Sequence, residues 1–321
     1  MNSTVLFRMN GVAPGFLREY GCRNCSQCSS EKPQAHISAS LLIKNSWRQR
    51  RSLRYHILFD CGMGAIDSLI DFGAPPVDFV FISHGHPYHS LGLDRLVWGQ
   101  VRHGGPQQIS VYCTKETMET GPQRIYPWFF EGSKPKLVAE SVEMRIPKCL
   151  DLGINLCITP VSAYQGLSAP GAVIWVVEFG HRDSETYHKF VLGWEFIHFI
   201  PRFPKEEEDS SYQGEMSGVE HLHEAYEELF KNVEELFFDG NTITSRPETH
   251  HMSIENALYF LIPEINPKRT WIVHYSGHED PEGPLSDEQL QNWVDRTKLN
   301  QGMVDTDIHV AKHGMLLAYD V

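Results

Sequence analysis

A run of apolar residues that ends in three closely spaced histidines constrains this chain more than any other feature of its sequence. Val77–Ser83 is almost continuously apolar, which is typical of a strand buried on both faces. His84, His86 and His89 follow it directly, within six residues. Neutral imidazole is the commonest side-chain ligand of zinc and iron, and the end of a buried strand supports it rigidly. The segment therefore predicts a metal site, with a metal-free histidine cluster as the alternative.

The apolar segments around this motif predict a chain in which strands dominate and helices separate them. Strands are expected at Thr4–Met9, Ile37–Lys44, Leu53–Phe59, Ile109–Cys113, Leu152–Pro160, Val173–Phe179, Lys189–Leu192, Thr270–Val273, Ile308–Val310 and Met315–Tyr319. Helices are expected at Ala65–Phe72, His221–Leu236, Ser253–Leu261 and from Ser286 to about Lys298, the last with a capping box. The acidic stretch 201–220 is expected to be an insertion, and 1–321 a single domain.

The charge balance limits the possible partners. The 28 Lys+Arg against 41 Asp+Glu give a net charge of −13, which argues against nucleic acid as the main partner because that role needs a basic surface. No apolar run approaches the roughly 18 residues of a membrane span, and the first residues do not have the pattern of a signal peptide. We therefore expect a cytoplasmic protein without a membrane partner.

Three cysteines form a second cluster of candidate ligands. Cys22, Cys25 and Cys28 are spaced so that one loop can fold their thiolates around a tetrahedral zinc ion. In a reducing compartment such spacing indicates metal rather than a disulfide framework, with three unligated thiols as the alternative. The other four cysteines are expected to be small buried hydrophobic residues: Cys61, Cys113, Cys149 and Cys157.

The histidine segment resembles the His-x-His-x-Asp-His signature of the metallo-β-lactamase fold. The resemblance is greatest to the branch that contains the cyclic phosphodiesterase of the carbon–phosphorus lyase pathway and the pyrroloquinoline quinone biosynthesis protein B. Further similar segments are Gly21-Cys22, Phe59–Gly62, Thr159-Pro160, His251–Ser253, Ile272–His274 and His313–Met315. The resemblance implies an α/β fold, an αββα sandwich of two mixed sheets with helices on the outer faces.

The resemblance also implies a ligand set for the metal centre. The family's ligand positions correspond here to the retained histidines and to three substituted residues: His84, His86, His89 and His274, and Tyr88, Gln165 and Glu195 in place of the usual Asp, His and Asp. The set implies one or two divalent ions (Zn, Mn or Fe) on His84, His86, His89, Glu195 and His274. A phenol is bulky and titrates near 10, so Tyr88 is no substitute for a compact carboxylate.

Two histidines near the end of the chain receive roles from the same resemblance. His251, with His250 as the adjacent alternative, would complete a structural Cys3His zinc site with Cys22, Cys25 and Cys28. His278 corresponds to a region where the family sometimes places groups that contact the substrate, and it is assigned to the catalytic set with Tyr88 and Glu195.

Three functions follow from this interpretation. The first is a metal-dependent hydrolase of a phosphodiester or a related small anionic ester, with an altered metal site. The second is a catalytically decayed member of the fold that acts as a binding or scaffold subunit. The third is a mononuclear iron site that uses the Tyr88 phenolate. The expected partner is a small anionic substrate or ligand, and the family implies a possible homodimer.

Overall fold

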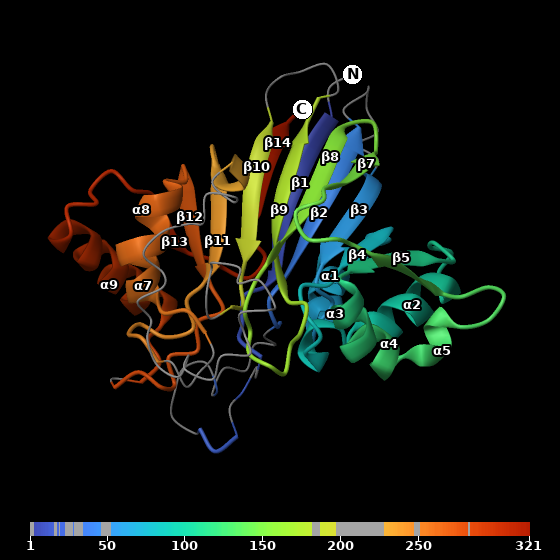
Figure 1. Ribbon diagram of the computed structural model, residues 1–321, viewed down its shortest axis with the longest axis horizontal. Coiled ribbons are helices and arrows are strands. Elements are labelled where there is room, and N and C mark those ends of the chain that lie inside the picture. Colours follow the sequence, from blue (N-terminus) through green and yellow to red (C-terminus); the bar gives the residue numbers. More distant parts are fainter. Residues whose placement is uncertain are drawn as a thin grey trace.

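The computed structural model describes residues 3–15, 18, 20–22, 28, 35–45, 53–181, 187–196, 228–246, 251–281 and 283–321. In this part of the chain, two seven-stranded sheets pack face to face with helices outside them (Figure 1). The αββα sandwich expected from the sequence is confirmed. The acidic stretch 201–220, most of the helix expected at His221–Leu236, Cys25 and His250 lie outside the described residues.

The first sheet has the strand order β14-β1-β2-β3-β4-β5-β6. Its strands are β1 (Ser3–Gly11), β2 (Ser38–Asn45), β3 (Leu53–Phe59), β4 (Phe79–Phe81), β5 (Ile109–Cys113), β6 (Leu137–Ser141) and β14 (Leu316–Asp320). Neighbouring strands from β14 to β3 are antiparallel, whereas those from β3 to β6 are parallel.

The second sheet repeats this plan in the order β13-β12-β11-β10-β9-β8-β7. Its strands are β7 (Lys148–Asp151), β8 (Asn155–Ser162), β9 (Val173–Gly180), β10 (His188–Gly193), β11 (Glu235–Asp239), β12 (Arg269–Val273) and β13 (Ile308–Val310). Pairs from β7 to β10 are antiparallel and pairs from β10 to β13 are parallel. Each sheet therefore has a parallel half in which several strands end at the same edge.

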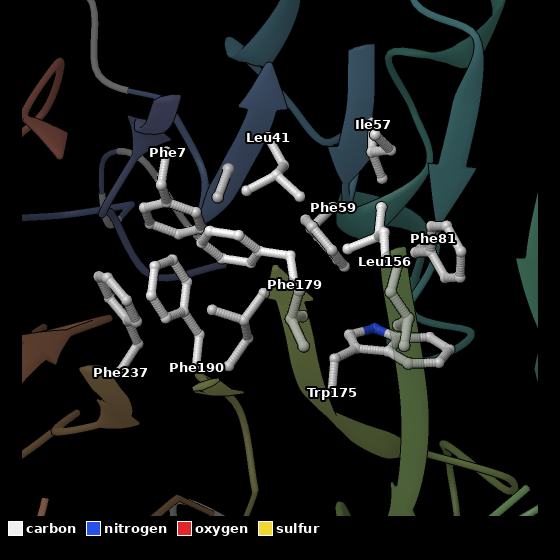
Figure 2. Packing of buried hydrophobic residues seen from close by; sticks show 14 of the residues in the cluster. Phe7, Leu41, Ile57, Phe59, Phe81, Leu156, Trp175, Phe179, Phe190 and Phe237 are labelled. Carbon is white, nitrogen blue, oxygen red and sulfur yellow. The ribbon is translucent and has the colours of Figure 1, made fainter. Parts of the chain in front are cut away.

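The two sheets share one aromatic core between their inner faces (Figure 2). Phe7 on β1 reaches across to the second sheet, where its ring centroid lies 5.4 Å from that of Phe190 and 4.8 Å from that of Phe237. Phe81 on β4 makes an edge contact with Trp175 on β9, at 5.3 Å between centroids. Burial of such large side chains is the main favourable contribution to the stability of the sandwich.

Helices cover the two outer faces, on opposite sides of Figure 1. The first sheet carries α1 (Ala65–Asp71), α2 (Leu93–Arg102), α3 (Lys115–Thr120), α4 (Pro122–Ile125), α5 (Pro127–Phe130) and the 3₁₀ turn η1 (Pro87–His89). The second carries α7 (Ile254–Asn256), the π-helical η5 (Ala257–Leu261), α8 (Ile262–Ile265) and α9 (Asp287–Asn300). No helix of the described residues is long and apolar enough to cross a membrane.

The capping box expected at Ser286 is confirmed. The Ser286 hydroxyl accepts a hydrogen bond from the backbone N–H of Gln289, and the Gln289 side chain accepts one from the backbone N–H of Ser286. By contrast, the end of the helix expected at His221–Leu236 is wrong, because Glu235–Asp239 forms β11. All five residues of β11 are buried between β10 and β12, so pairing within the sheet overrides the helical spacing of the apolar residues.

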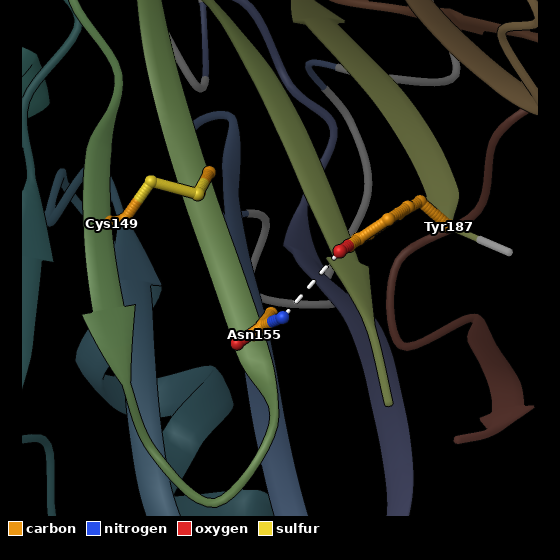
Figure 3. Close-up of a disulfide and its surroundings, with 4 residues drawn as sticks. Cys149, Asn155 and Tyr187 are labelled. Carbon is orange, nitrogen blue, oxygen red and sulfur yellow. Dashed lines mark hydrogen bonds between the residues drawn. A yellow bond between two sulfur atoms is a disulfide. The ribbon is translucent and has the colours of Figure 1, made fainter. Parts of the chain in front are cut away.

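Two of the cysteines expected to be buried and reduced form a disulfide. Cys149 on β7 and Cys157 on β8 lie opposite each other in the antiparallel pair and are bonded (Figure 3). Cys149 is exposed, because it lies on the outer side of an edge hairpin. The expectation is confirmed for Cys61 and Cys113, which are fully buried beneath the helices of the first sheet.

One buried histidine in the first sheet makes the stability of the fold depend on pH. His56 on β3 is fully buried; its Nε2 lies 2.8 Å from the Ser40 Oγ, and its Nδ1 lies 3.2 Å from the Pro76 carbonyl oxygen. Burial lowers the pKa of His56 from 6.5 to about 4. Between these values the unfolded chain takes up a proton that the folded chain excludes, so stability falls as the pH falls.

We therefore expect the free energy of unfolding of the wild type, measured relative to that of His56→Asn, to fall by about 3 kcal/mol as the pH falls from 7 to about 4. Urea unfolding of both proteins at several pH values measures this difference. The same substitution at the exposed His103 is the control. A difference between wild type and His56→Asn that stays constant across this range would contradict the assignment.

Candidate metal centre

The predicted histidine motif lies where the parallel halves of both sheets end. Asp60 follows β3 and His84 follows β4, while Glu195, Asp239 and His274 lie at or just beyond the ends of β10, β11 and β12. Binding sites of α/β proteins commonly form at the carboxyl ends of parallel strands. Asp60 and His274 both have left-handed backbone conformations, with φ of 53° and 63°. Such strain in residues other than glycine is typical of functional sites.

The carboxylate of Glu195 is the centre of the cluster, and its two oxygens face different partners. Oε1 accepts hydrogen bonds from the Tyr88 hydroxyl at 2.9 Å and from the Gln165 side-chain nitrogen at 3.1 Å. The Nε2 of His84 lies 3.5 Å from this oxygen and the Nδ1 of His86 lies 3.7 Å from it. These distances bring together Glu195 and four of the positions that the resemblance identified.

The other oxygen of Glu195 faces only imidazoles among the described residues. Oε2 lies 2.5 Å from the Nε2 of His89, 3.4 Å from that of His274 and 3.9 Å from that of His36. His274 and His89 were predicted as ligands, but His36 was not. His36 precedes β2 in the sequence and forms an isolated β-bridge with Ala13. This part of the sequence carries no motif, so only the fold shows that His36 belongs to the histidine cluster.

Two further carboxylates orient the imidazoles from behind. Asp60 Oδ2 lies 2.9 Å from the Nδ1 of His89 and also accepts a hydrogen bond from the Trp194 indole nitrogen at 2.9 Å. Asp239 Oδ1 lies 3.4 Å from the Nδ1 of His274. Pairs of this kind hold a histidine ring so that its other nitrogen points at a metal. Neither aspartate was predicted to have a role, although each directly follows or ends an apolar strand.

The electrostatics of the cluster require positive charge. Glu195, Asp60 and Asp239 are almost completely buried, and their ion pairs among the described residues are all with histidines. Burial alone would lower the pKa of His274, but the carboxylates of Glu195 and Asp239 outweigh it and raise that pKa to about 10. Three buried carboxylates therefore attract protons or a metal ion into the centre.

The same cluster contains buried polar atoms that form no hydrogen bond with the described residues. They are both ring nitrogens of His36 and the Nε2 of His274, which lies 3.4 Å from Glu195 Oε2. An unsatisfied buried polar group costs about 1–3 kcal/mol, so such atoms are rare without a functional reason. Imidazole nitrogens and a carboxylate oxygen are suitable ligands for zinc and related divalent ions, so the residues fit the metal that the family implies.

The Tyr88 hydroxyl is a hydrogen-bond donor here rather than a phenolate. Burial, followed by the charge of Glu195, raises the pKa of Tyr88 far above 10. The hydroxyl oxygen also lies 2.7 Å from the Nδ1 of His86.

The structure places His251 and His278 in clusters other than those predicted for them. His278 lies at the cysteine cluster, with its Nε2 3.3 Å from the Sγ of Cys28, and Cys22 belongs to the same group of candidate ligands. His251 instead lies behind the histidine centre, with its Nδ1 2.7 Å from Asp239 Oδ2. His278 lies in the loop that follows β12, and this loop brings it to the cysteines. The spacing of these residues in the sequence does not reveal that contact.

Comparisons with known proteins agree with this architecture. Residues 55–275 match the Beta-lactamase superfamily domain, which is more than half of the chain. The chain therefore belongs to the beta-lactamase superfamily, a fold superfamily that consists mostly of hydrolases. No curated protein sequence matches it.

Solved structures with this fold match nearly the whole chain at low sequence identity. A diphosphatase from the PhnP family aligns with a TM-score of 0.61 and 16% identity, covering 100% of this chain and 99% of its own. Zn²⁺-bound PqqB from Methylobacterium extorquens aligns at 0.62 and 13%, covering 97% and 99%. Unliganded yeast PDE1 aligns at 0.60 and 13%, covering 98% and 99%. These likenesses support the shared fold that the sequence resemblance implied.

The position of His278 leads to a prediction about the cysteine cluster. We expect His278→Ala to weaken metal binding by the cysteines, because it removes the imidazole beside Cys28, whereas His251→Ala leaves that binding intact. Cobalt substitution measures this site separately, since only cysteine ligation produces thiolate-to-cobalt charge-transfer absorption. Loss of that absorption in His251→Ala, with retention in His278→Ala, would restore the original assignment of His251.

Proposed function

We propose that this protein is a metal-dependent hydrolase of phosphodiesters or related small anionic esters. The observation that carries the proposal is the buried Glu195 carboxylate, with the Nε2 atoms of His89, His274 and His36 within 3.9 Å of one oxygen. A divalent ion bound there would act as a Lewis acid and lower the pKa of a coordinated water molecule toward neutrality.

The residues of the chain supply the remaining functions of such a site. His86 is the most exposed of the histidines paired with Glu195, with 19% of its side chain accessible, and its Nε2 lies 3.0 Å from the Ser168 hydroxyl. Substrate would enter from this side. The Tyr88 hydroxyl lies next to His86 and would have to turn its one proton away from Glu195 to donate a hydrogen bond to negative charge that develops on an ester oxygen. The chain is strongly acidic, so an anionic substrate depends on positive charge within the centre.

The substrate class is supported by the fold relatives. The PhnP-family neighbour is described as a diphosphatase, and yeast PDE1 has the same fold. The sequence segments that resemble a cyclic phosphodiesterase point to the same chemistry. Phosphodiesters are therefore the first substrates to test.

Glu195→Gln tests the proposed reaction. We expect it to reduce metal-stimulated hydrolysis of bis(p-nitrophenyl) phosphate by at least about 100-fold, because the amide removes the charge around which the histidines are arranged. The matched control is Glu178→Gln, which removes a carboxylate paired with Lys189 on the second sheet. Full activity in Glu195→Gln, or no metal-stimulated hydrolysis in the wild type, would contradict the proposal.

One feature of the centre favours the alternative of a catalytically decayed binding or scaffold protein. Tyr88 and Gln165 donate hydrogen bonds to Glu195 Oε1, on the side that faces His84 and His86. Neutral donors thereby satisfy an oxygen that would otherwise contact a first metal ion. A protein in which these two donors replaced the contact with the first metal ion would bind ligands without hydrolysing them.

The double variant Tyr88→Asp, Gln165→His tests whether these two donors limit metal binding. It replaces both with a carboxylate and an imidazole, and it removes a ring that packs against Gly15, so we expect about one additional metal ion per chain. Elemental analysis of the purified wild type and variant measures this. An unchanged metal content would show that Tyr88 and Gln165 do not close the site.

A further inference from the structure

We propose that one divalent metal ion is held by His36, His274 and Glu195, with His89 as the fourth donor, so that His36 supplies the ligand that Tyr88 cannot provide. This inference deepens the proposed function and rests on it, since it names the ligands of the ion on which hydrolysis depends.

The two oxygens of Glu195 differ in their partners. Oε1 accepts two hydrogen bonds, from Tyr88 and Gln165. Oε2 has one close partner, the Nε2 of His89 at 2.5 Å, and two more distant ones, the Nε2 atoms of His274 and His36 at 3.4 Å and 3.9 Å. These two more distant nitrogens form no hydrogen bond with the described residues. The candidate ligand atoms of His36, His274 and Glu195 all lie within 4.8 Å of one another, so the Oε2 side is the side whose imidazole nitrogens can bind a cation.

The His36 ring packs against the rings of Tyr88, His89 and His274, but no hydrogen bond explains an imidazole at this position. Its side chain is fully buried, and neither ring nitrogen has a hydrogen-bond partner among the described residues. His56, the buried histidine of β3, is in contrast partnered at both nitrogens. An apolar side chain at position 36 would avoid the cost of burying two unpaired nitrogens, which is about 1–3 kcal/mol for each group. A metal bond to Nε2 would offset that cost.

The backbone around His36 holds its ring against the centre. The His36 N–H donates to the carbonyl of Met63 at 2.9 Å, and Ile37 donates to the carbonyl of Ala13 at 3.1 Å. A Cβ at Gly62 would lie 3.0 Å from the His36 Nδ1 and 2.0 Å from the Tyr88 carbonyl oxygen, so only glycine allows this close approach. The His274 N–H donates to the carbonyl of Val12, which fixes the second ligand relative to the same loop.

The donor set indicates the kind of ion. Three imidazoles and one carboxylate suit a zinc ion and its substitute, Co²⁺, and the water molecule of the proposed reaction would take a fifth position. His89 and His274 have carboxylates at their Nδ1 atoms, as metal-binding histidines usually do. His84 and His86 would then remain outside this ligand set, 3.0 Å apart between Nε2 and Nδ1.

Cobalt titration of the full-length, metal-stripped protein tests the proposal. We expect the wild type to show visible cobalt absorption from a nitrogen- and oxygen-ligated centre, separate from the thiolate-to-cobalt absorption of the cysteine cluster. His36→Asn should weaken cobalt binding at this centre at least about 100-fold. This is more than the loss expected when a residue that only hydrogen-bonds to a metal ligand is removed. The thiolate band should persist and shows that the variant is folded. The matched control, His56→Asn, should keep both signals.

The opposite pattern would overturn the proposal. Wild-type affinity in His36→Asn, with loss of the visible absorption in His84→Asn, would place the ion on the Oε1 side of Glu195. If His36→Asn does not fold, nitrogen NMR of the wild type decides the question. Zinc should then shift the His36 Nε2 resonance and leave those of His56 in place, and an unmoved His36 resonance would refute the ligand set.

Hydrolysis measured on the same proteins separates this inference from the proposed function. Metal binding that depends on His36, without hydrolysis of bis(p-nitrophenyl) phosphate, would reject the proposed reaction and retain the ligand set. Metal-stimulated hydrolysis that is unchanged in His36→Asn would retain the reaction and reject the ligand set.

Discussion

The burial of the Glu195 carboxylate among histidines is the interaction on which the rest of the centre depends. A buried carboxylate is stable only when positive charge or hydrogen-bond donors surround it. Here the partners come from the loops after β4 and β12, from the segment before β2 and from Gln165. The two sheets must therefore close on each other before the charge is neutralised, which couples formation of the site to formation of the sandwich.

The substitutions relative to the family change one side of this carboxylate more than the other. Tyr88 and Gln165 convert the Oε1 side into a set of hydrogen bonds. The Oε2 side retains His89 and His274 and gains His36. Loss of ligands at motif positions thus does not by itself mean loss of metal, because a residue from a distant segment can enter the same volume.

The sequence predicted most of the fold because apolar patterning and capping act locally. The strand expected at Leu53–Phe59 and the capping box at Ser286 match the structure, and the histidines that the family resemblance implied as ligands, His84, His89 and His274, lie around Glu195. The disulfide between Cys149 and Cys157 escaped prediction, since it depends on the register of two strands. The sequence predicted a helix at Ser253–Leu261, but not that its second part, η5, is π-helical.

By itself, the sequence determined the superfamily, the sandwich and most of the candidate metal ligands, because each leaves a signature within a short segment. Only the tertiary structure decided which of these side chains meet. It brought His278 to Cys28, placed His251 behind His274 and carried His36 to Glu195. Contacts between segments far apart in the sequence, such as Cys28 and His278, depend on strand order and loop paths, which local spacing does not encode.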